Sequence, residues 1–334
     1  MEGIKRLTPG NEDNQKANRP DAAAQVAEAL KLLRARDFAR HRARVSEMLD
    51  TASRAGSAQA TELCALFDAM GIARPQSWDR AFDRLELAAR QGSISAQQQL
   101  LLLACPSAEL TFPDPVPDWA DVRRSISLNE LLTTRPRTVV SDVPRIRIIE
   151  QFATPAECRW LIDCAQSRTS PALIVDSTGR QVTDPVRTNR GAQFLLHDMD
   201  VVLEVIRTRI SLALRIPLHF FEPTQVLHYA VGEEFKIHHD YFDPNDVDRQ
   251  REVGHGQRIA TCLIYLNSDF EGGETEFPSI DLRYRGEVGD AIFWANVEVD
   301  GQPDRKTLHA GLPPTAGEKW VLSQWVRDRT PEPA

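Results

Sequence analysis

Two side chains that can bind a metal lie two residues apart in the segment QVLHYAVGEEFKIHHDYF, where His238 and Asp240 follow an alternating apolar run. On a β-strand, residues i and i+2 point to the same face, so this imidazole and this carboxylate would converge on a common point. A second histidine from a neighbouring strand would complete a set of two histidines and one carboxylate, which suits non-haem Fe(II) and leaves coordination positions open. His309 is the candidate for that position.

A buried cation is expected near these residues. Lys319 lies inside the apolar segment KWVLSQWV, where an isolated ammonium group would be costly to bury without an anionic partner. A dicarboxylate cosubstrate would supply that anion. His-x-Asp alone is a weak signal, because a solvated pair at a strand end explains it equally well, but His309 and Lys319 together favour a binding site.

A longer series of motifs surrounds the candidate ligands. The pattern Y-x-x-G-x-x-F-x-x-H-x-D-x-F, which ends at Phe242, is followed by RIATCLIYLN, GGETEFP, GDAIFWAN, LHAG and GEKW. In order and spacing, residues 143–329 resemble the catalytic domain of the prolyl 4-hydroxylase type of Fe(II)/2-oxoglutarate dioxygenase. The resemblance implies a hydroxylase of aliphatic C–H bonds that consumes 2-oxoglutarate and O2, needs Fe(II), and takes ascorbate as reductant.

The same resemblance implies a role for individual residues. It implies that His238, Asp240 and His309 hold Fe(II), and that Lys319 anchors the distal carboxylate of 2-oxoglutarate. The residues that it places at the cosubstrate are Tyr229 and Tyr265. Thr261 is added as a cosubstrate residue because it lies on the same face as Tyr265, at i and i+4 of a strand. The residues that the resemblance places on the substrate side of the iron are Arg258, Trp325 and Phe235.

Phe235 departs from the pattern, because the peptidyl-prolyl enzymes tend to carry tyrosine three residues before the first ligand. The missing hydroxyl puts the prolyl substrate in question and leaves the cosubstrate unaffected. Strand alternation alone would also turn Phe235 away from His238, so that only a bulge or bend near Lys236 could bring both side chains to one face.

The chain divides into regions of different composition. Residues 1–20 are polar and are expected to form a disordered tail. Residues 21–104 show helical spacing and an echo that places Gly56 and Gly92 36 residues apart, which predicts helix-turn-helix repeats and resembles Sel1-like repeats. The proline-rich start of residues 105–142 predicts a linker. Residues 143–330 contain eight short strands in series, which predict a double-stranded β-helix, or jelly roll, so the fold class is α+β.

Composition limits the choice of partners. The net charge of −8 argues against nucleic acid, and no segment has the length and apolarity of a membrane span. We therefore expect a cytoplasmic protein. Its expected partner is a peptide, protein or amino-acid-like substrate, which the helical region would deliver. The alternative is that the helical region only packs or mediates a homodimer.

Two other functions remain open from the sequence. Within the same enzyme class, the substrate could be a free amino acid or a small metabolite instead of a residue in a peptide. In a different class, the chain would be a helical-repeat interaction protein with a decayed oxygenase domain. Decay would normally erode a ligand or the anchor, and here all four positions are filled.

Overall fold

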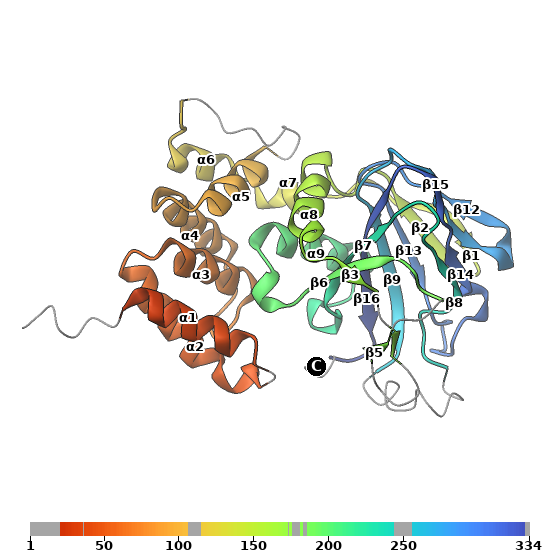
Figure 1. The fold of residues 1–334 in the computed structure, drawn as a ribbon, viewed down its shortest axis with the longest axis horizontal. Coiled ribbons are helices and arrows are strands. Elements are labelled where there is room, and N and C mark those ends of the chain that lie inside the picture. Colours follow the sequence, from red (N-terminus) through yellow and green to blue (C-terminus); the bar gives the residue numbers. More distant parts are fainter. Residues whose placement is uncertain are drawn as a thin grey trace, which may run out of the picture.

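The helices and the sheets occupy opposite ends of the molecule (Figure 1). The computed structural model describes residues 21–35, 37–105, 115–172, 174–175, 181–182, 186–243 and 256–330. The predicted tail, residues 1–20, and residues 106–114 of the predicted linker lie outside the described residues. Within the described part, no helix is long and apolar enough to cross a membrane.

The N-terminal region consists of helices, of which each of the first five packs against the next. They are α1 (Ala22–Leu33), α2 (Phe38–Arg54), α3 (Ala58–Met70), α4 (Trp78–Arg90), α5 (Ile94–Ala104), α6 (Trp119–Ser125) and α7 (Leu128–Leu132). Side-chain oxygens of Ser57, Ser77 and Ser93 accept hydrogen bonds from the first turns of α3, α4 and α5. These N-caps satisfy backbone donors that a helix start leaves unpaired, and they fix where each helix begins.

The 36-residue echo in the sequence corresponds to a repeated turn. Gly56 and Gly92 adopt φ values of +95° and +91°, a region that glycine enters at little cost. Each is followed by a serine whose backbone N–H donates to a helix carbonyl at 3.0 Å, from Ser57 to Ala52 and from Ser93 to Ala88. The repeat is therefore structural, while its kinship with Sel1-like repeats stays a prediction.

The remainder of the described chain is built on two main antiparallel sheets. The larger has the order β1 (Thr138–Asp142), β2 (Arg145–Ile149), β13 (Ala291–Ala295), β9 (Arg258–Tyr265), β16 (Lys319–Arg327), β7 (Thr224–Tyr229), β6 (Arg190–Phe194), β3 (Ser170–Pro171). The smaller has the order β12 (Leu282–Tyr284), β11 (Thr275–Phe277), β14 (His309–Gly311), β8 (Phe235–His238). Two short pairs join β10 (Glu271–Gly272) to β15 (Pro314–Ala316) and β4 (Ile174–Val175) to β5 (Gln181–Val182). The predicted jelly roll and the α+β class are confirmed.

Alternation along the central strands separates two cores. On β16, Leu322 and Val326 pack with the helices, whereas Val321 belongs to the cluster inside the jelly roll. Neighbouring β9 and β13 repeat the pattern, because successive side chains on a strand point to opposite faces. The inward positions of these strands line the space between the two sheets, and the polar candidates lie there.

Two helices cover the outer face of the larger sheet, α8 (Pro155–Gln166) and α9 (Val201–Leu214) (Figure 1). Thr154 and Glu157 form the capping box that the segment TPAE predicts at the start of α8. The amphipathic spacing of α9 predicts one apolar face. In the structure, nearly every side chain of α9 from Val201 to Ile210 is buried, because its second face packs on α3 and α5 of the helical array.

Candidate active site

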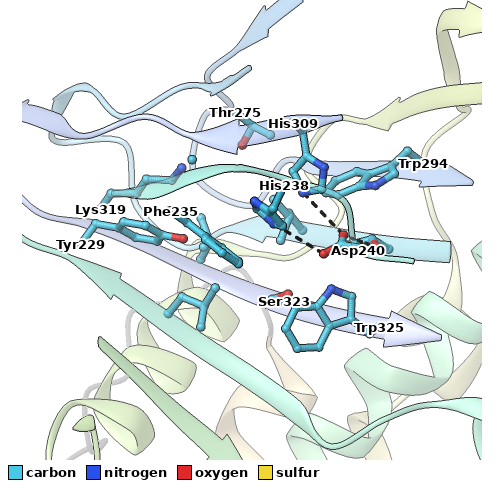
Figure 2. A pocket seen from close by; sticks show the side chains of 15 residues that line it. Tyr229, Phe235, His238, Asp240, Thr275, Trp294, His309, Lys319, Ser323 and Trp325 are labelled. Carbon is cyan, nitrogen blue, oxygen red and sulfur yellow. Dashed lines mark hydrogen bonds and ion pairs between the residues drawn. The ribbon is translucent and has the colours of Figure 1, made fainter. Parts of the chain in front are cut away.

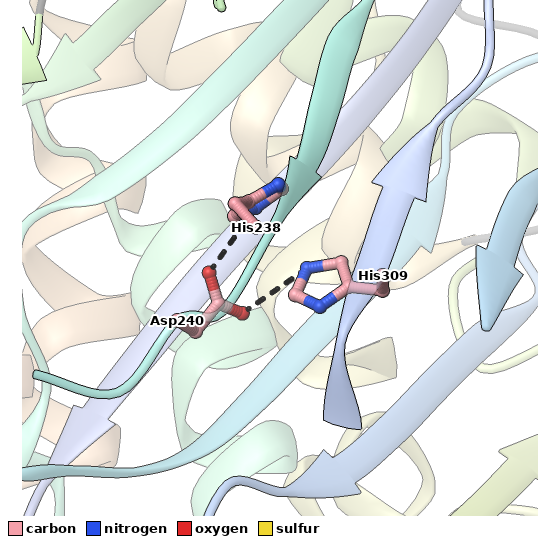
Figure 3. A group of neighbouring side chains, drawn as sticks. All are labelled: His238, Asp240 and His309. Carbon is pink, nitrogen blue, oxygen red and sulfur yellow. Dashed lines mark ion pairs between the residues drawn. The ribbon is translucent and has the colours of Figure 1, made fainter. Parts of the chain in front are cut away.

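Three side chains converge between the two sheets (Figure 3). Within the described part of the chain, His238, Asp240 and His309 are the group of potential metal ligands whose binding atoms all lie within 4.8 Å of one another. The Nε2 atoms of His238 and His309 lie 3.7 Å and 3.6 Å from the two carboxylate oxygens of Asp240. His238 and His309 are paired in register across β8 and β14.

Hydrogen bonds orient each of the three groups. Nδ1 of His238 bonds the carbonyl of Lys236 at 2.7 Å, and Nδ1 of His309 bonds the carbonyl of Thr307 at 2.8 Å. A carbonyl can only accept, so each Nδ1 carries the proton and each Nε2 presents a lone pair. This arrangement is typical of histidines that ligate metals.

The charges of the three groups also suit a divalent cation. Burial alone would raise the pKa of Asp240, but His309, His238 and the Thr261 hydroxyl outweigh burial and lower it, so the carboxylate is ionised. Burial, reinforced by His238, lowers the pKa of His309 to about 4, which keeps its imidazole neutral at neutral pH. One anionic oxygen ligand and two imidazoles are the donor set expected for non-haem Fe(II).

A bulge in β8 brings Phe235 into the pocket. His238 pairs with His309 and Phe235 pairs with Gly311, so β8 advances three residues while β14 advances two. The extra residue places Phe235 and His238 on one face, as the sequence required. Phe235 lines the pocket and its ring stacks on His238, with centroids 3.5 Å apart (Figure 2).

Lys319 is a buried cation that lacks a carboxylate partner among the described residues. It is 1% exposed, and Nζ donates to the carbonyl of Gly273 at 2.7 Å. The rings of Tyr229 and Tyr265 have their centroids 5.1 and 5.2 Å from this nitrogen. Burial lowers the pKa of Lys319 to about 7. A bound carboxylate would supply the counter-charge that Lys319 lacks, and 2-oxoglutarate carries such a carboxylate.

The structure divides the other predicted cosubstrate residues between pocket wall and support. Tyr229 lines the pocket. Thr261 lines it too, but its hydroxyl donates to Asp240 at 2.7 Å and therefore serves the candidate metal centre. Tyr265 is not among the lining residues, and its hydroxyl bonds Thr275 and the carbonyl of Tyr284. Thr275 lines the pocket in its place and was not predicted.

Of the predicted substrate residues, Trp325 lies on the far side of the pocket from Lys319, whereas Phe235 lies beside Tyr229 and His238 (Figure 2). Trp325 lines the pocket, whereas Arg258 stands behind it, with its guanidinium carbon 3.7 Å from the Trp325 ring centroid. Both Nε and Nη2 of Arg258 donate to Glu222 at 2.8 Å, and Nε of Arg327 donates to Glu222 at 2.6 Å. The buried Glu222 therefore fixes Arg258 against the tryptophan.

Sequence reasoning missed the supporting residues Glu222, Thr275 and Asn296. The amide of Asn296 donates to Thr261, which in turn donates to Asp240, so that Asn296 is the end of a buried chain of hydrogen bonds. The repeated alternation along β13 places Asn296 on the face of Trp294, but nothing in the motif predicts its partner. Glu222 precedes β7 and carries no sequence signal.

Comparison with known proteins agrees with this geometry. Residues 224–327 match the 2OG-Fe(II) oxygenase superfamily. Prolyl 4-hydroxylase 1 of Arabidopsis thaliana is 36% identical over 208 residues, which make up 57% of this chain and 71% of that protein. The chain belongs to the prolyl 4-hydroxylase family of Fe(II)/2-oxoglutarate dioxygenases. Its cofactor and cosubstrates are therefore Fe(II), 2-oxoglutarate and O2.

Other relatives of this dioxygenase include prolyl 4-hydroxylase subunit alpha-1 of Rattus norvegicus, which is 33% identical over 192 residues. These cover 57% of this chain and 36% of the rat protein. Among solved structures, the viral collagen prolyl hydroxylase of Paramecium Bursaria Chlorella virus-1, in its 2-oxoglutarate complex, has 30% identity and a TM-score of 0.44. That alignment covers 56% of this chain and 98% of the viral one.

Proposed function

We propose that this dioxygenase hydroxylates a prolyl residue in a peptide or protein. The observation that carries the proposal is the likeness to the plant prolyl 4-hydroxylases, at up to 36% identity across more than half of the chain. The pocket supports it, because an apolar wall formed by Phe235 and Trp325 faces the candidate metal ligands. Such a wall suits an aliphatic ring better than a charged side chain.

Different residues of the pocket would bind the metal, orient its carboxylate ligand and bind the cosubstrate. When bound, Fe(II) with 2-oxoglutarate and O2 supplies the oxidising power that hydroxylates an aliphatic C–H bond. His238, Asp240 and His309 would hold the metal, and Thr261 keeps the carboxylate oriented. Lys319 would neutralise the distal carboxylate of 2-oxoglutarate at the far end of the pocket. Ascorbate is proposed as the reductant.

The substrate would bind against Trp325, which Arg258 and Glu222 hold in place. Arg258 stacks on the tryptophan and is itself fixed by two hydrogen bonds to Glu222. Because a charged group buried with its partner keeps a single geometry, this wall is preorganised before substrate arrives. Arg258→Ala should lower hydroxylation far more than uncoupled turnover of 2-oxoglutarate.

A second candidate substrate is a free amino acid or a small metabolite. Phe235 favours it, because a phenyl ring offers no hydrogen bond to the carbonyl of a peptide. Phe235→Tyr restores a hydroxyl at this position and should change the preference between peptide and free amino acid by a modest factor.

The test is mass spectrometry after incubation of the protein with Fe(II), ascorbate, 2-oxoglutarate and either proline-containing peptides or free proline. The expected result is the gain of one oxygen on a prolyl residue of the peptide, together with one succinate per product. His309→Ala is the matched inactive control. Hydroxylation of free proline with unmodified peptides would favour the second candidate, and succinate without any oxygenated product would contradict both.

A further inference from the structure

A column of three stacked groups ends on the candidate ligand His238. The ring of Phe235 lies parallel to the imidazole, with centroids 3.5 Å apart and planes 16° apart. The guanidinium carbon of Arg187 lies 4.7 Å from the centroid of the same Phe235 ring. Cation and rings of this kind attract one another through the charge distribution of the aromatic ring.

Backbone pairing holds Arg187 and Phe235 of this column together. Arg187 and Phe235 form an antiparallel bridge. The N–H of Thr188 donates to the carbonyl of Glu234 at 3.0 Å, and the N–H of Lys236 donates to the carbonyl of Val186 at 2.8 Å. Residues 186–188 thus dock on the edge of β8, just before the metal-binding end of that strand.

Arg187 itself is firmly placed. It is 7% exposed, with Nε donating to Asn189 at 3.2 Å and Nη2 to Gln225 at 3.4 Å. Its guanidinium also lies 5.9 Å from the ring of Trp325, on the substrate wall. Within the described residues it makes no ion pair with a carboxylate, so its partners are amides and the two aromatic rings.

The two candidate histidine ligands differ in how they are enclosed. The side chain of His309 is 6% exposed and packs between Phe277, at 5.5 Å, and Trp294, at 4.9 Å. The side chain of His238 is 15% exposed. Its hydrogen bond to Lys236 fixes the tautomer but leaves the ring free to tilt about that bond. The face of Phe235 removes this freedom.

We propose that Arg187 and Phe235 are positioning residues that fix the plane of His238 at the metal centre. This inference rests on the proposed metal site and adds to it a role for Phe235 that does not require contact with substrate. Phe235 acts on His238 directly, and Arg187 acts through Phe235 by holding its ring against the imidazole. The contact of Arg187 with Trp325 extends the column to the substrate wall.

The test uses Co(II) as a spectroscopic replacement for Fe(II) in the full-length protein. Titration measures affinity, and the visible d–d absorption reports coordination geometry without any turnover. Phe235→Leu should weaken Co(II) binding on the order of tenfold, the range for residues that orient metal ligands, and should change the d–d spectrum. Phe235→Tyr keeps the ring and should restore both. Arg187→Gln should have a smaller effect in the same direction.

Arg190→Gln is the matched control, because Arg190 donates to the carbonyl of Thr169 from the same segment and contacts no ring of the column. It should leave Co(II) binding unchanged. In the Phe235→Leu background, Arg187→Gln should add little, since the arginine acts through the ring. Circular dichroism of each metal-free variant identifies loss of fold, and if Phe235→Leu does not fold, weakened Co(II) binding in Arg187→Gln supports the proposal and wild-type binding in Arg187→Gln overturns it.

The outcomes separate this inference from the proposed metal site. Loss of Co(II) binding in His238→Ala, with wild-type affinity and spectrum in folded Phe235→Leu, would overturn the positioning role and leave the metal site standing. Retained Co(II) binding in His238→Ala would overturn both. Additive effects of the Arg187 and Phe235 changes would show that Arg187 does not act through the ring.

Discussion

Lys319 carries a charge that its surroundings disfavour. Burial lowers its pKa from 10.5 to about 7. Between these values the unfolded chain binds a proton that the folded, ligand-free protein does not, so stability of the ligand-free fold rises with pH over this window. A bound carboxylate needs the ammonium form, and binding of 2-oxoglutarate therefore takes up a proton above pH 7.

We predict that 2-oxoglutarate affinity falls about tenfold per pH unit above pH 7, the slope of a single coupled proton. Calorimetry with metal-loaded protein in buffers of different ionisation enthalpy measures both the affinity and the proton uptake. Lys319→Arg keeps its charge throughout and should flatten the profile. An equally steep fall in Lys319→Arg would assign the proton to another group.

Removal of the ammonium group should weaken 2-oxoglutarate binding without loss of the metal. A charge-assisted contact is typically worth about 1.5–3 kcal/mol, so Lys319→Ala should reduce affinity roughly ten- to hundredfold. Apparent affinity from succinate formation, together with the iron content of the variant, checks this. Unchanged affinity would move the anchor elsewhere, with Arg327 the next basic residue to test.

The proposed iron ligands should act as a unit. Each of His238→Ala, Asp240→Ala and His309→Ala removes one of the three groups whose binding atoms converge, and should abolish both bound iron and uncoupled succinate formation. Iron content by elemental analysis is the measurement. Full activity in His309→Ala would contradict the assignment. His239→Ala is the control, because Nε2 of His239 lies 3.1 Å from the carbonyl of Arg305 and His239 does not belong to the three converging groups.

At this scale the sequence predicted identities better than contacts. Residue type and spacing were enough to bring His238, Asp240 and His309 together, because strand alternation and an antiparallel partner fix where they point. Residue type and spacing did not predict the contacts of Tyr265, whose hydroxyl bonds Thr275 on another strand. Contacts between strands depend on how neighbouring strands are aligned in register. The periodicity of one strand does not specify that alignment.

Among the elements, β8 shows where strand alternation fails to predict which face a side chain occupies. Regular alternation would turn Phe235 away from His238, and the bulge against β14 reverses this. A bulge inserts one residue into one strand only, so it changes the facing of every residue beyond it. The strand itself was predictable from its pattern; the side of the sheet on which Phe235 lies required the resemblance to a known family.

The turn after β10 holds the anchor in place. Gly273 has φ +68°, and a Cβ there would lie 2.9 Å from the Phe270 ring and 3.4 Å from Lys319. Its carbonyl is also the acceptor for Lys319. Gly273→Ala should therefore weaken 2-oxoglutarate binding several-fold, beyond the strain of about 1–2 kcal/mol that a left-handed alanine brings.

Gly301→Ala is the control that separates the backbone strain of a left-handed alanine from displacement of Lys319. Gly301 has φ +84°, but no atom lies within 4 Å of its added Cβ. It should lose a similar amount of stability, measured by denaturant unfolding, and keep its 2-oxoglutarate affinity, measured by calorimetry. Equal affinities in the two variants would show that the Gly273 carbonyl does not position the lysine.

For the whole molecule, the sequence separated a helical region from a strand-rich one, and the structure joins them. One continuous core runs from α3–α5 through α8 and α9 to β9, β13 and β16. Gln99, fully buried in α5, accepts a hydrogen bond from the N–H of Val201 at the start of α9 and donates to Glu62 of α3. Delivery of substrate by the helices, dimerisation through them and a cytoplasmic location stay predictions.

This shared core changes the expected effect of truncation. The division of the sequence into a helical and a strand-rich region predicts that a protein starting near Asp118 keeps turning over 2-oxoglutarate slowly in the absence of substrate. Its α9 would then expose the face that α3 and α5 cover. Exposing roughly four apolar side chains costs about 1.5–3 kcal/mol each, which is comparable to a typical net stability of about 5–15 kcal/mol.

We therefore predict that the protein starting at Asp118 loses cooperative thermal unfolding and, with it, 2-oxoglutarate binding. The matched control starts at Asp37 and lacks only α1, whose buried residues belong to a separate cluster with Val45, Leu49 and Phe67. It should keep cosubstrate binding, measured by calorimetry, and a melting transition of the catalytic core. If the protein starting at Asp118 instead melts cooperatively and binds 2-oxoglutarate normally, the helices are an independent module, and their role would be substrate delivery instead of support.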